Sequence, residues 1–259
     1  MPDRARLADL AEKLRALHHQ ASPLVLPNAW DAATAKLVVE AGFPVVATTS
    51  SGVAASLGWP DGEQTPIDEV FGALWRISRV IDVPLTADIE AGYGLTPEEL
   101  VERLLEAGAV GCNLEDTDHA HGRTLRNAEE QAQTLAAVKR AATHAGVNIV
   151  LNARVDAFLR QAHGDAPPIE EAIRRGRMYL EAGADCVFPI GAPDEGTIAA
   201  LVDGIPGPMN AIASFRGAPG LRRLSAMGVR RISYAGRLQH AALDEHRRRL
   251  SAIASGDDI

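Results

Sequence analysis

The sequence predicts an α/β fold and, within that class, a single-domain (β/α)8 TIM barrel spanning residues 1–259. Short apolar runs of strand length recur along the chain, and amphipathic segments of helical length separate them. There are eight such runs in 259 residues, which matches the usual size of a (β/α)8 barrel. Strand–helix alternation also allows an open doubly wound sheet, but eight units favour the closed barrel.

The expected elements follow one another at regular intervals. The strands lie at 23–28, 44–50, 84–90, 111–116, 148–154, 185–191, 208–213 and 230–236. The clearest helical patterns lie at 31–42, 96–109, 127–146, 169–184 and about 238–254. Several of them close on a glycine, as helix C-termini often do. No segment has the composition of a linker, so one domain is expected.

Charge and hydropathy argue against two classes of partner. The net charge is −8, and no segment concentrates Lys and Arg as a nucleic-acid-binding surface would. The N-terminus is charged every few residues, and no segment offers the roughly 20 apolar residues of a membrane span. A cytoplasmic location is therefore expected. Cys112 and Cys186 each lie in an apolar run, where a buried hydrophobic role is expected for both.

Polar residues gather where the expected strands end, whereas the strand bodies are apolar. These residues are Asn28, the turn Thr48–Gly52, Asp88, Glu90, Glu115, Asp116, Arg154, Asp156, Asn210 and Ser233. In a barrel, the carboxyl ends of all strands meet at one face, and the active site lies there. The pattern predicts a buried ligand site, with Asn210 among the candidates for binding substrate.

Three acids predict a metal site at this face. Asp88, Glu90 and Glu115 follow the neighbouring third and fourth strands, with no Cys or His at matching positions. Carboxylate oxygens are the ligands that Mg²⁺ and Mn²⁺ prefer, and three converging acids without a cation would repel one another. The alternatives are an acidic surface turn at 88–94 and a helix-entry acid pair at Glu115 and Asp116.

A single arginine predicts the position of a substrate anion. Arg154 ends the fifth strand, and its planar guanidinium suits a carboxylate or phosphoryl group held by two hydrogen bonds. The alternative is an ion pair with Asp156 or Glu115 that ties the strand ends together. Thr49, Ser50, Ser51 and Gly52 could offer hydroxyl and N–H groups to the same anion, or form a plain turn.

The segment 118–127, DHAHGRTLRN, follows the fourth strand and has the composition of a lid. Its His119 and His121 are candidate proton donors, because histidine titrates near neutral pH. The alternative is that both histidines are simply solvated.

These residues lie in motifs that resemble the isocitrate lyase and phosphoenolpyruvate mutase superfamily. Residues 28–62 resemble the first two strand–helix units of its members, and DIEAGYG at 88–94 resembles their metal motif. NLED at 113–116 resembles the second acidic motif, and NARVDAF at 152–158 the segment with the substrate arginine. The matches occur in the family's order over roughly residues 23–190.

The resemblance implies a (β/α)8 barrel with Mg²⁺ held largely through water by Asp88, Glu90 and Glu115. It also implies that Asp61 is a further acid near the metal, and that the ligand is a small carboxylate, a 2-oxo acid or its enolate. Relatives cleave or form a C–C or P–C bond beside a pyruvate-like unit. The resemblance further implies a homotetramer in which the last helix, about 238–254, packs on a neighbouring subunit.

The lid departs from the family pattern. The isocitrate and methylisocitrate lyases carry K-[KR]-C-G-H there, whereas residues 118–123, DHAHGR, contain no cysteine, which argues against those two activities. The main hypothesis is a Mg²⁺-dependent lyase for a small 2-oxo or hydroxy acid, acting by C–C cleavage or decarboxylation. The alternatives are P–C bond chemistry on phosphonopyruvate and a barrel that binds metal and carboxylate without turnover.

Overall fold

Parallel strands and the helices between them make up the computed structural model, which describes residues 2–160, 166–215 and 219–256. The strands are β1 Leu24–Leu26, β2 Asn28–Ala29, β3 Val46–Thr48, β4 Leu85–Asp88, β5 Gly111–Glu115, β6 Thr117–Asp118, β7 Thr124–Leu125, β8 Val150–Val155, β9 Cys186–Pro189, β10 Asn210–Ile212 and β11 Arg231–Ser233. The helices are α1 Arg4–Leu17, α2 Ala32–Glu40, α3 Ser50–Leu57, α4 Ile67–Ser78, α5 Pro97–Glu106, α6 Ala128–His144, α7 Pro168–Glu181, α8 Glu195–Gly204, α9 Leu221–Ala226 and α10 Arg237–Ser255.

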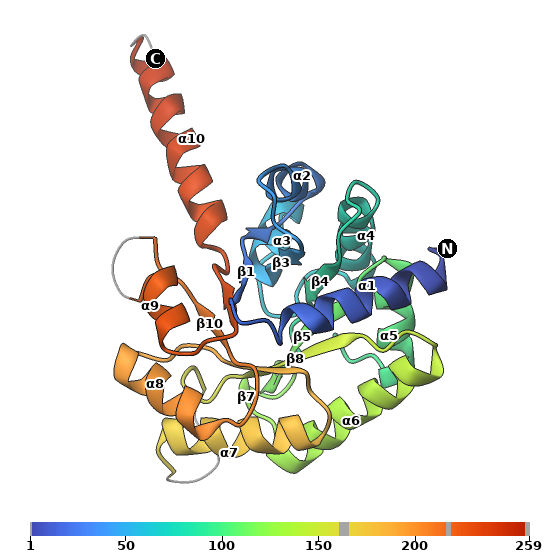
Figure 1. Cartoon of the computed structure of the whole chain (residues 1–259). Helices are drawn as coiled ribbons and strands as arrows, with labels where there is room; N and C mark the ends of the chain where they lie inside the picture. The colour runs from blue at the N-terminus through green and yellow to red at the C-terminus, as the bar shows by residue number, and fades with distance from the viewer. Residues whose placement is uncertain (1, 161–165, 216–218, 257–259) are drawn as a thin grey trace.

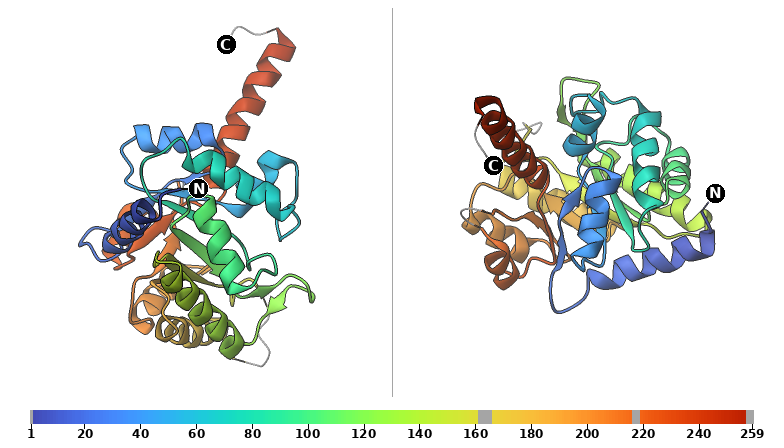
Figure 2. Two further views of the ribbon diagram at one scale, coloured as in Figure 1. Left: turned by 90° about the vertical axis from the view of Figure 1, so that its right-hand side faces the viewer. Right: turned by 90° about the horizontal axis from the view of Figure 1, so that it is seen from above.

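The α/β class and the parallel strands are confirmed. Six strands pair in the order β2-β3-β4-β5-β8-β9, and three more pair in the order β1-β11-β10, all of them parallel. A parallel bridge between Val187 and Met209 joins β9 to the residue before β10. Each of the eight expected strand runs overlaps at least one strand. Figures 1 and 2 show the helices on the outside of these strands, with α10 projecting away from the rest of the chain.

The sequence did not predict the antiparallel hairpin of β6 and β7. It pairs Thr117 with Leu125 and Asp118 with Thr124, so it forms the base of the segment that was expected to be a lid. Strands of two residues carry too little periodicity to be recognised from sequence.

No helix in the described part of the chain is long and apolar enough to cross a bilayer.

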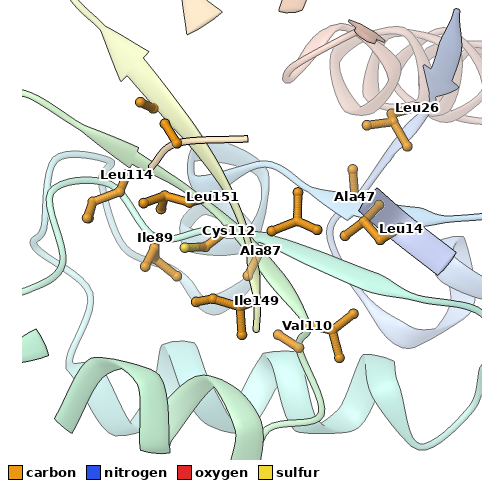
Figure 3. Close-up of a cluster of buried hydrophobic side chains, with 14 of the residues drawn as sticks. Leu14, Leu26, Ala47, Ala87, Ile89, Val110, Cys112, Leu114, Ile149 and Leu151 are labelled. Carbon is orange, nitrogen blue, oxygen red and sulfur yellow. The ribbon is translucent and has the colours of Figure 1, made fainter. Parts of the chain in front are cut away.

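The apolar core lies between the strands and the surrounding helices. Side chains such as Ala87, Cys112, Leu114 and Leu151 alternate along their strands with residues of the opposite face and pack in this layer (Figure 3). Cys112 and Cys186 are free and fully buried, and burial raises the pKa of both thiols to about 12. Both thiols are therefore protonated at neutral pH, as a hydrophobic role requires.

The opposite face of the strands is polar, and its side chains hydrogen-bond across the interior. The Asn152 amide donates to Asn113 Oδ1 at 2.8 Å and to Asn210 Oδ1 at 3.1 Å. The buried Arg231 guanidinium donates to Asn113 Oδ1 at 3.1 Å and to Thr86 Oγ1 at 3.4 Å. These bonds link β4, β5, β8, β10 and β11 beneath the strand ends, and so fix the positions from which the site residues project.

Helix α5 begins with a reciprocal cap that gives a stability prediction. Thr96 Oγ1 accepts from the Glu99 amide, and Glu99 Oε2 accepts from the Thr96 amide at 2.9 Å. Thr96→Ala should lower the free energy of unfolding by about 1 kcal/mol and the melting temperature by roughly 2–4 °C. Thr134→Ala, within α6, is the control and should change stability by less than about 0.5 kcal/mol. Equal melting temperatures for the two variants would contradict the capping role.

Candidate active site

Asp88 ends β4 and presents a carboxylate oxygen that lacks a partner. Its amide donates to Thr48 Oγ1 at 2.9 Å, and its Oδ2 accepts from the Ser50 amide at 3.2 Å, at the start of α3. Its Oδ1 is buried and has no hydrogen bond to another described residue. Burial raises the pKa of Asp88, and the charge of Arg154 partly opposes that rise. A buried, unpaired carboxylate oxygen is where a cation would be stabilised.

Glu90 lies just beyond Asp88 in a backbone conformation that is rare for a residue with a side chain. Its φ is +51°, and Tyr93 and Glu63 have φ values of +55° and +57°. The Tyr93 hydroxyl donates to Glu90 Oε1 at 2.7 Å, and the Glu63 amide donates to Glu90 Oε2 at 2.6 Å. Burial is the main cause that raises the pKa of Glu90 to about 7, and nearby Asp61 raises it further.

Glu115 ends β5 and lies between two basic side chains. Its Oε1 is 2.7 Å from His119 Nε2, and its Oε2 is 2.7 Å from an Arg154 guanidinium nitrogen. Its side chain is 3% exposed. Burial raises the pKa of this carboxyl, while the hydrogen bond from His119 and the charge of Arg154 lower it. The Glu115 amide donates to the Glu90 carbonyl at 2.9 Å, which holds these two acids side by side.

Arg154 makes the ion pairs that were considered as the alternative to a substrate role. Its Nε donates to Asp156 Oδ1 at 2.7 Å and a terminal nitrogen donates to Asp156 Oδ2 at 3.0 Å, in addition to the pair with Glu115. Burial alone would lower the pKa of Arg154, but Glu115 and Asp156 raise it. The guanidinium is therefore permanently charged and held in a fixed orientation at the end of β8. These ion pairs orient the guanidinium, and they are compatible with a role in binding substrate.

A second buried network of hydrogen bonds holds the backbone of Asp156 in place, and the sequence analysis missed it. The Asp156 amide donates to Asp116 Oδ1 at 2.9 Å, and Asp116 Oδ2 accepts from Arg175 and from the Tyr179 hydroxyl. Glu171 also pairs with Arg175, and the side-chain hydrogen bond from Arg174 is the main cause that lowers the pKa of Glu171 to about 2. Arg175 and Tyr179 lie in α7, where nothing in the helical pattern distinguishes them from surface residues.

The two histidines of segment 118–127 lie in different environments. His119 contacts Glu115, and its Nδ1 is buried without a partner among the described residues. Burial lowers the pKa of His119, but Glu115 outweighs that effect and the pKa is raised overall. His121 is 83% exposed at its side chain and pairs with Asp118 at 3.0 Å. The structure brings His119 to the acids and leaves His121 at the surface.

The remaining candidates surround Asp88. The Thr49–Gly52 turn opens α3, and its Ser50 amide contacts Asp88, whereas Thr49 and Ser51 pair with each other through their hydroxyl groups at 3.2 Å. The residue Asp61 is exposed and is close enough to raise the pKa of both Asp88 and Glu90. Its backbone carbonyl accepts from Arg123, a residue of the lid segment.

Asn210 is buried at the start of β10. Its Oδ1 accepts from Asn152, and its amide group donates to Ser233 Oγ at 3.0 Å.

The sequence analysis missed Glu63 and Tyr93. For Tyr93, the glycines on either side of it in 88–94 were a usable signal, because they indicate a tight backbone turn beside the acids.

The donor set fits a hard divalent cation. Asp88, Glu90 and Glu115 would supply oxygen ligands, and Asp88 Oδ1 has no hydrogen-bond partner within the described part of the chain. Within the described residues, no three His, Cys, Asp or Glu side chains are arranged to hold a metal ion. The fit is therefore to an ion with many water ligands, as Mg²⁺ usually keeps, rather than to a closed cage of side chains.

A model of the phosphoenolpyruvate phosphomutase family matches residues 14–254. The chain belongs to this family. It is thus a member of the isocitrate lyase and phosphoenolpyruvate mutase superfamily, and the resemblance drawn from its motifs is confirmed.

Relatives of this phosphomutase-family chain include an uncharacterized protein and a named lyase. An uncharacterized protein of Mycobacterium tuberculosis strain H37Rv is 31% identical, over 94% of this chain and 89% of that protein. The 2-methylisocitrate lyase of Bacillus subtilis strain 168 is 30% identical, over 78% of this chain and 66% of that enzyme. The expectation of an enzyme from a family of carbon–carbon lyases is confirmed.

Solved structures of the superfamily have the same fold. A Burkholderia cenocepacia J2315 protein described as a candidate phosphonomutase is 37% identical, with a TM-score of 0.83 over 94% of this chain and 99% of that chain. Oxaloacetate acetylhydrolase in complex with its product oxalate is 25% identical, with a TM-score of 0.85 over 96% of this chain and 86% of that chain.

Proposed function

We propose that the chain is a Mg²⁺-dependent lyase that acts on a small 2-oxo or hydroxy acid through a pyruvate enolate. The bond broken is a C–C bond beside the pyruvate unit, or the bond to a departing carboxylate. The observation that carries the proposal is Asp88 Oδ1, a buried carboxylate oxygen with no hydrogen-bond partner among the residues that the structure describes, close to Glu115 and to the fixed charge of Arg154. Mn²⁺ could serve in place of Mg²⁺, because it prefers the same ligands.

Asp88 would hold the metal, with Glu90 and Glu115 in direct or water-mediated contact. When bound, the ion would act as a Lewis acid that stabilises the negative charge of the enolate oxygen. Arg154 would hold the substrate carboxylate, and its permanent charge would favour the anionic transition state over the less charged ground state. The N–H and hydroxyl groups of Thr49–Gly52 would orient the same anion from the opposite side.

His119 is the residue we propose as proton donor, because it lies in the lid and its Nε2 contacts Glu115. His119→Gln should lower kcat about 100-fold, the lower end of the range for losing a general acid. The matched control is His121→Gln, two residues along the chain but exposed, which should keep kcat within about twofold. Equal losses in both variants would indicate a disturbed lid rather than a missing acid, and would remove His119 from the mechanism.

We also infer that the two parallel sheets form one closed (β/α)8 barrel in a single domain. The Val187–Met209 bridge between β9 and β10 supports closure on one side. The direct chain connection from β1 to β2 supports it on the other, because only Pro27 separates those strands. A hydrogen bond from Arg231 of β11 to Thr86 of β4 crosses the interior, as expected for strands arranged in a ring.

P–C bond chemistry is the second candidate, and the similarity to the Burkholderia cenocepacia protein favours it. The missing lid cysteine argues against 2-methylisocitrate as the substrate, although relatives carry that lyase's name. The deciding experiment measures Mg²⁺-dependent pyruvate release from a panel of 2-oxo and hydroxy acids, and phosphate release from phosphonopyruvate. Pyruvate without phosphate supports the lyase, and phosphate supports the second candidate. Mg²⁺-dependent oxalate binding without either product would indicate a barrel that binds but does not turn over.

The assembly we propose is a homotetramer in which α10 packs on a neighbouring subunit. This helix projects from the body (Figure 1), and its Leu243, Leu250 and Ile253 are 48%, 52% and 62% exposed. Light scattering should give about four times the chain mass of 27.5 kDa. A monomer at working concentration would contradict the proposal. The cytoplasmic location stays a prediction from the sequence.

A further inference from the structure

Arg231, at the start of β11, is a buried cation without an acidic partner among the described residues. Its guanidinium donates to Asn113 Oδ1 at 3.1 Å and to Thr86 Oγ1 at 3.4 Å, and both acceptors are neutral groups. Within residues 2–160, 166–215 and 219–256, no carboxylate forms a hydrogen bond or an ion pair with it. By contrast, Arg154 and Arg175 each pair with two carboxylates.

The third neighbour of Arg231 is His18, which follows α1. One guanidinium nitrogen lies 3.3 Å from His18 Nε2, and His18 Nδ1 lies 2.8 Å from the Leu14 carbonyl oxygen. Burial is the main cause that lowers the pKa of His18 to about 4, and the charge of Arg231 lowers it further. The imidazole is therefore neutral at pH 7, with Nδ1 donating to the carbonyl and Nε2 accepting from Arg231. His18 thus solvates the guanidinium without balancing its charge.

Strand geometry places this charge beneath Asp88. Thr86 lies two residues before Asp88 in β4, so both side chains are on the same face, about 6.6 Å apart along the strand. Asn113 lies opposite Asp88 in the pairing of β4 with β5. Because Arg231 contacts Thr86 and Asn113, its charge lies about one layer of side chains below Asp88. Burial lowers the pKa of Arg231, and the charge of Asp88 is among the causes that oppose this decrease.

Hydrogen bonding alone does not account for a guanidinium at this position. Thr86 and Asn113 would accept equally well from a neutral amide, whereas a buried charge without a paired carboxylate is costly. The charge has an effect that a neutral donor lacks. Because the interior of a protein screens weakly, a unit charge there acts on ions several ångströms away. It attracts an anion bound at the strand ends, and it repels a cation bound there.

We propose that Arg231 is a positioning residue whose buried charge strengthens the binding of an anionic 2-oxo acid or its enolate at the strand ends and weakens the binding of the metal ion. This inference rests on the proposed function, because it assumes that both ions bind above Asp88. The two arginines then differ in their roles. Arg154 contacts the substrate carboxylate, whereas Arg231 acts through the field of its charge and favours the enolate over the less charged oxo acid.

The test uses calorimetry on the whole protein to measure two dissociation constants, one for Mg²⁺ alone and one for oxalate at saturating Mg²⁺. A unit charge about 8 Å away, at an effective dielectric constant of about 20, changes a binding constant about tenfold or more. Arg231→Met should therefore bind Mg²⁺ at least tenfold more tightly and oxalate at least tenfold more weakly. Arg231→Lys keeps the charge but loses the fork of donors, and it should hold both constants within about threefold. Arg231→Gln serves as the neutral variant if Arg231→Met does not fold.

Arg230→Met is the matched control, because it removes the same charge from the neighbouring residue. Arg230 is exposed and donates to the carbonyls of Gln20 and Ala21. Water and salt screen a charge at that position, so both constants should stay within about twofold.

Opposite changes in the two constants are the result that a purely structural role would not produce. Weaker binding of both ions by the neutral variant, or no change in either, would overturn the proposal. A change in Arg231→Lys as large as that in Arg231→Met would assign the effect to the hydrogen bonds and would also overturn it. Failure of both neutral variants to fold would show that the fold itself needs the charge, with the same consequence. Absence of Mg²⁺-dependent oxalate binding in the unaltered protein would overturn the proposed function, and this inference with it.

Discussion

Asp88→Asn should lower kcat/KM about 1000-fold and abolish the rise in melting temperature that Mg²⁺ produces. The change removes a negative charge but hardly alters the shape of the side chain. A metal acting as a Lewis acid contributes several kcal/mol to the transition state, and each 1.36 kcal/mol is a factor of ten. The Ser50 amide that now donates to Asp88 Oδ2 can donate equally well to an Asn oxygen, so the local backbone should keep its position.

The stability of Asp88→Asn is an independent measurement of the role of this carboxylate. Burial raises the pKa of Asp88, which means that the folded protein holds this carboxylate at some cost when no cation is bound. Without Mg²⁺, Asp88→Asn should therefore be at least as stable as the unaltered protein. Asp118→Asn is the control, because Asp118 is an acid of the lid segment that pairs with the exposed His121, and this variant should keep both the activity and the Mg²⁺ effect. An Asp88→Asn protein that retains both would place the metal elsewhere.

The acids could be predicted together because the six-stranded sheet follows chain order, β2-β3-β4-β5-β8-β9. Residues that end consecutive strands become neighbours, and the structure pairs Asp88 with Asn113 and Glu115 with Arg154 in register. The eight strand positions could be predicted from apolar runs, because each run is a strand whose outer face is covered by helices.

The polar interior could not be predicted in the same way. Asn113 and Asn152 are polar residues within apolar runs, and Arg231 follows Arg230 at the start of another run, so no local pattern distinguishes them. Their role depends on contacts between strands far apart in sequence, such as Arg231 to Asn113. Likewise, Glu63 meets Glu90 only because the loop after α3 folds back with positive φ at Glu63, and no local pattern encodes that contact.

The charge balance of the site explains why one arginine has so many acidic partners. Glu115 and Asp156 contact Arg154, and Asp88 lies close enough to raise its pKa. One guanidinium faces three carboxylates, and the proposed divalent cation would balance their negative charge. A bound cation would relieve the demand on Arg154 and leave its charge available to a substrate carboxylate.

Arg154→Lys should lower kcat/KM by about 2–4 kcal/mol of transition-state stabilisation, the range for losing one donor to a developing oxyanion. Lysine keeps the positive charge but acts as a point charge, so it cannot hold Asp156 through two hydrogen bonds and also reach Glu115 and a substrate carboxylate. The metal-dependent rise in melting temperature should persist, because the acids of β4 and β5 are unchanged.

The control for this variant is Arg175→Lys, because Arg175 is a buried arginine of α7 that pairs with Asp116, after β5, and with Glu171 of the same helix. Breaking a buried ion pair is costly wherever it occurs, so both variants should melt at lower temperature. The two differ in activity: Arg175→Lys should keep kcat/KM within about fivefold once measured well below its melting temperature, whereas Arg154→Lys should not. An Arg154→Lys protein that loses stability but keeps full activity would show that Arg154 only ties β5 and β8 together, and its assignment to the substrate carboxylate would be withdrawn.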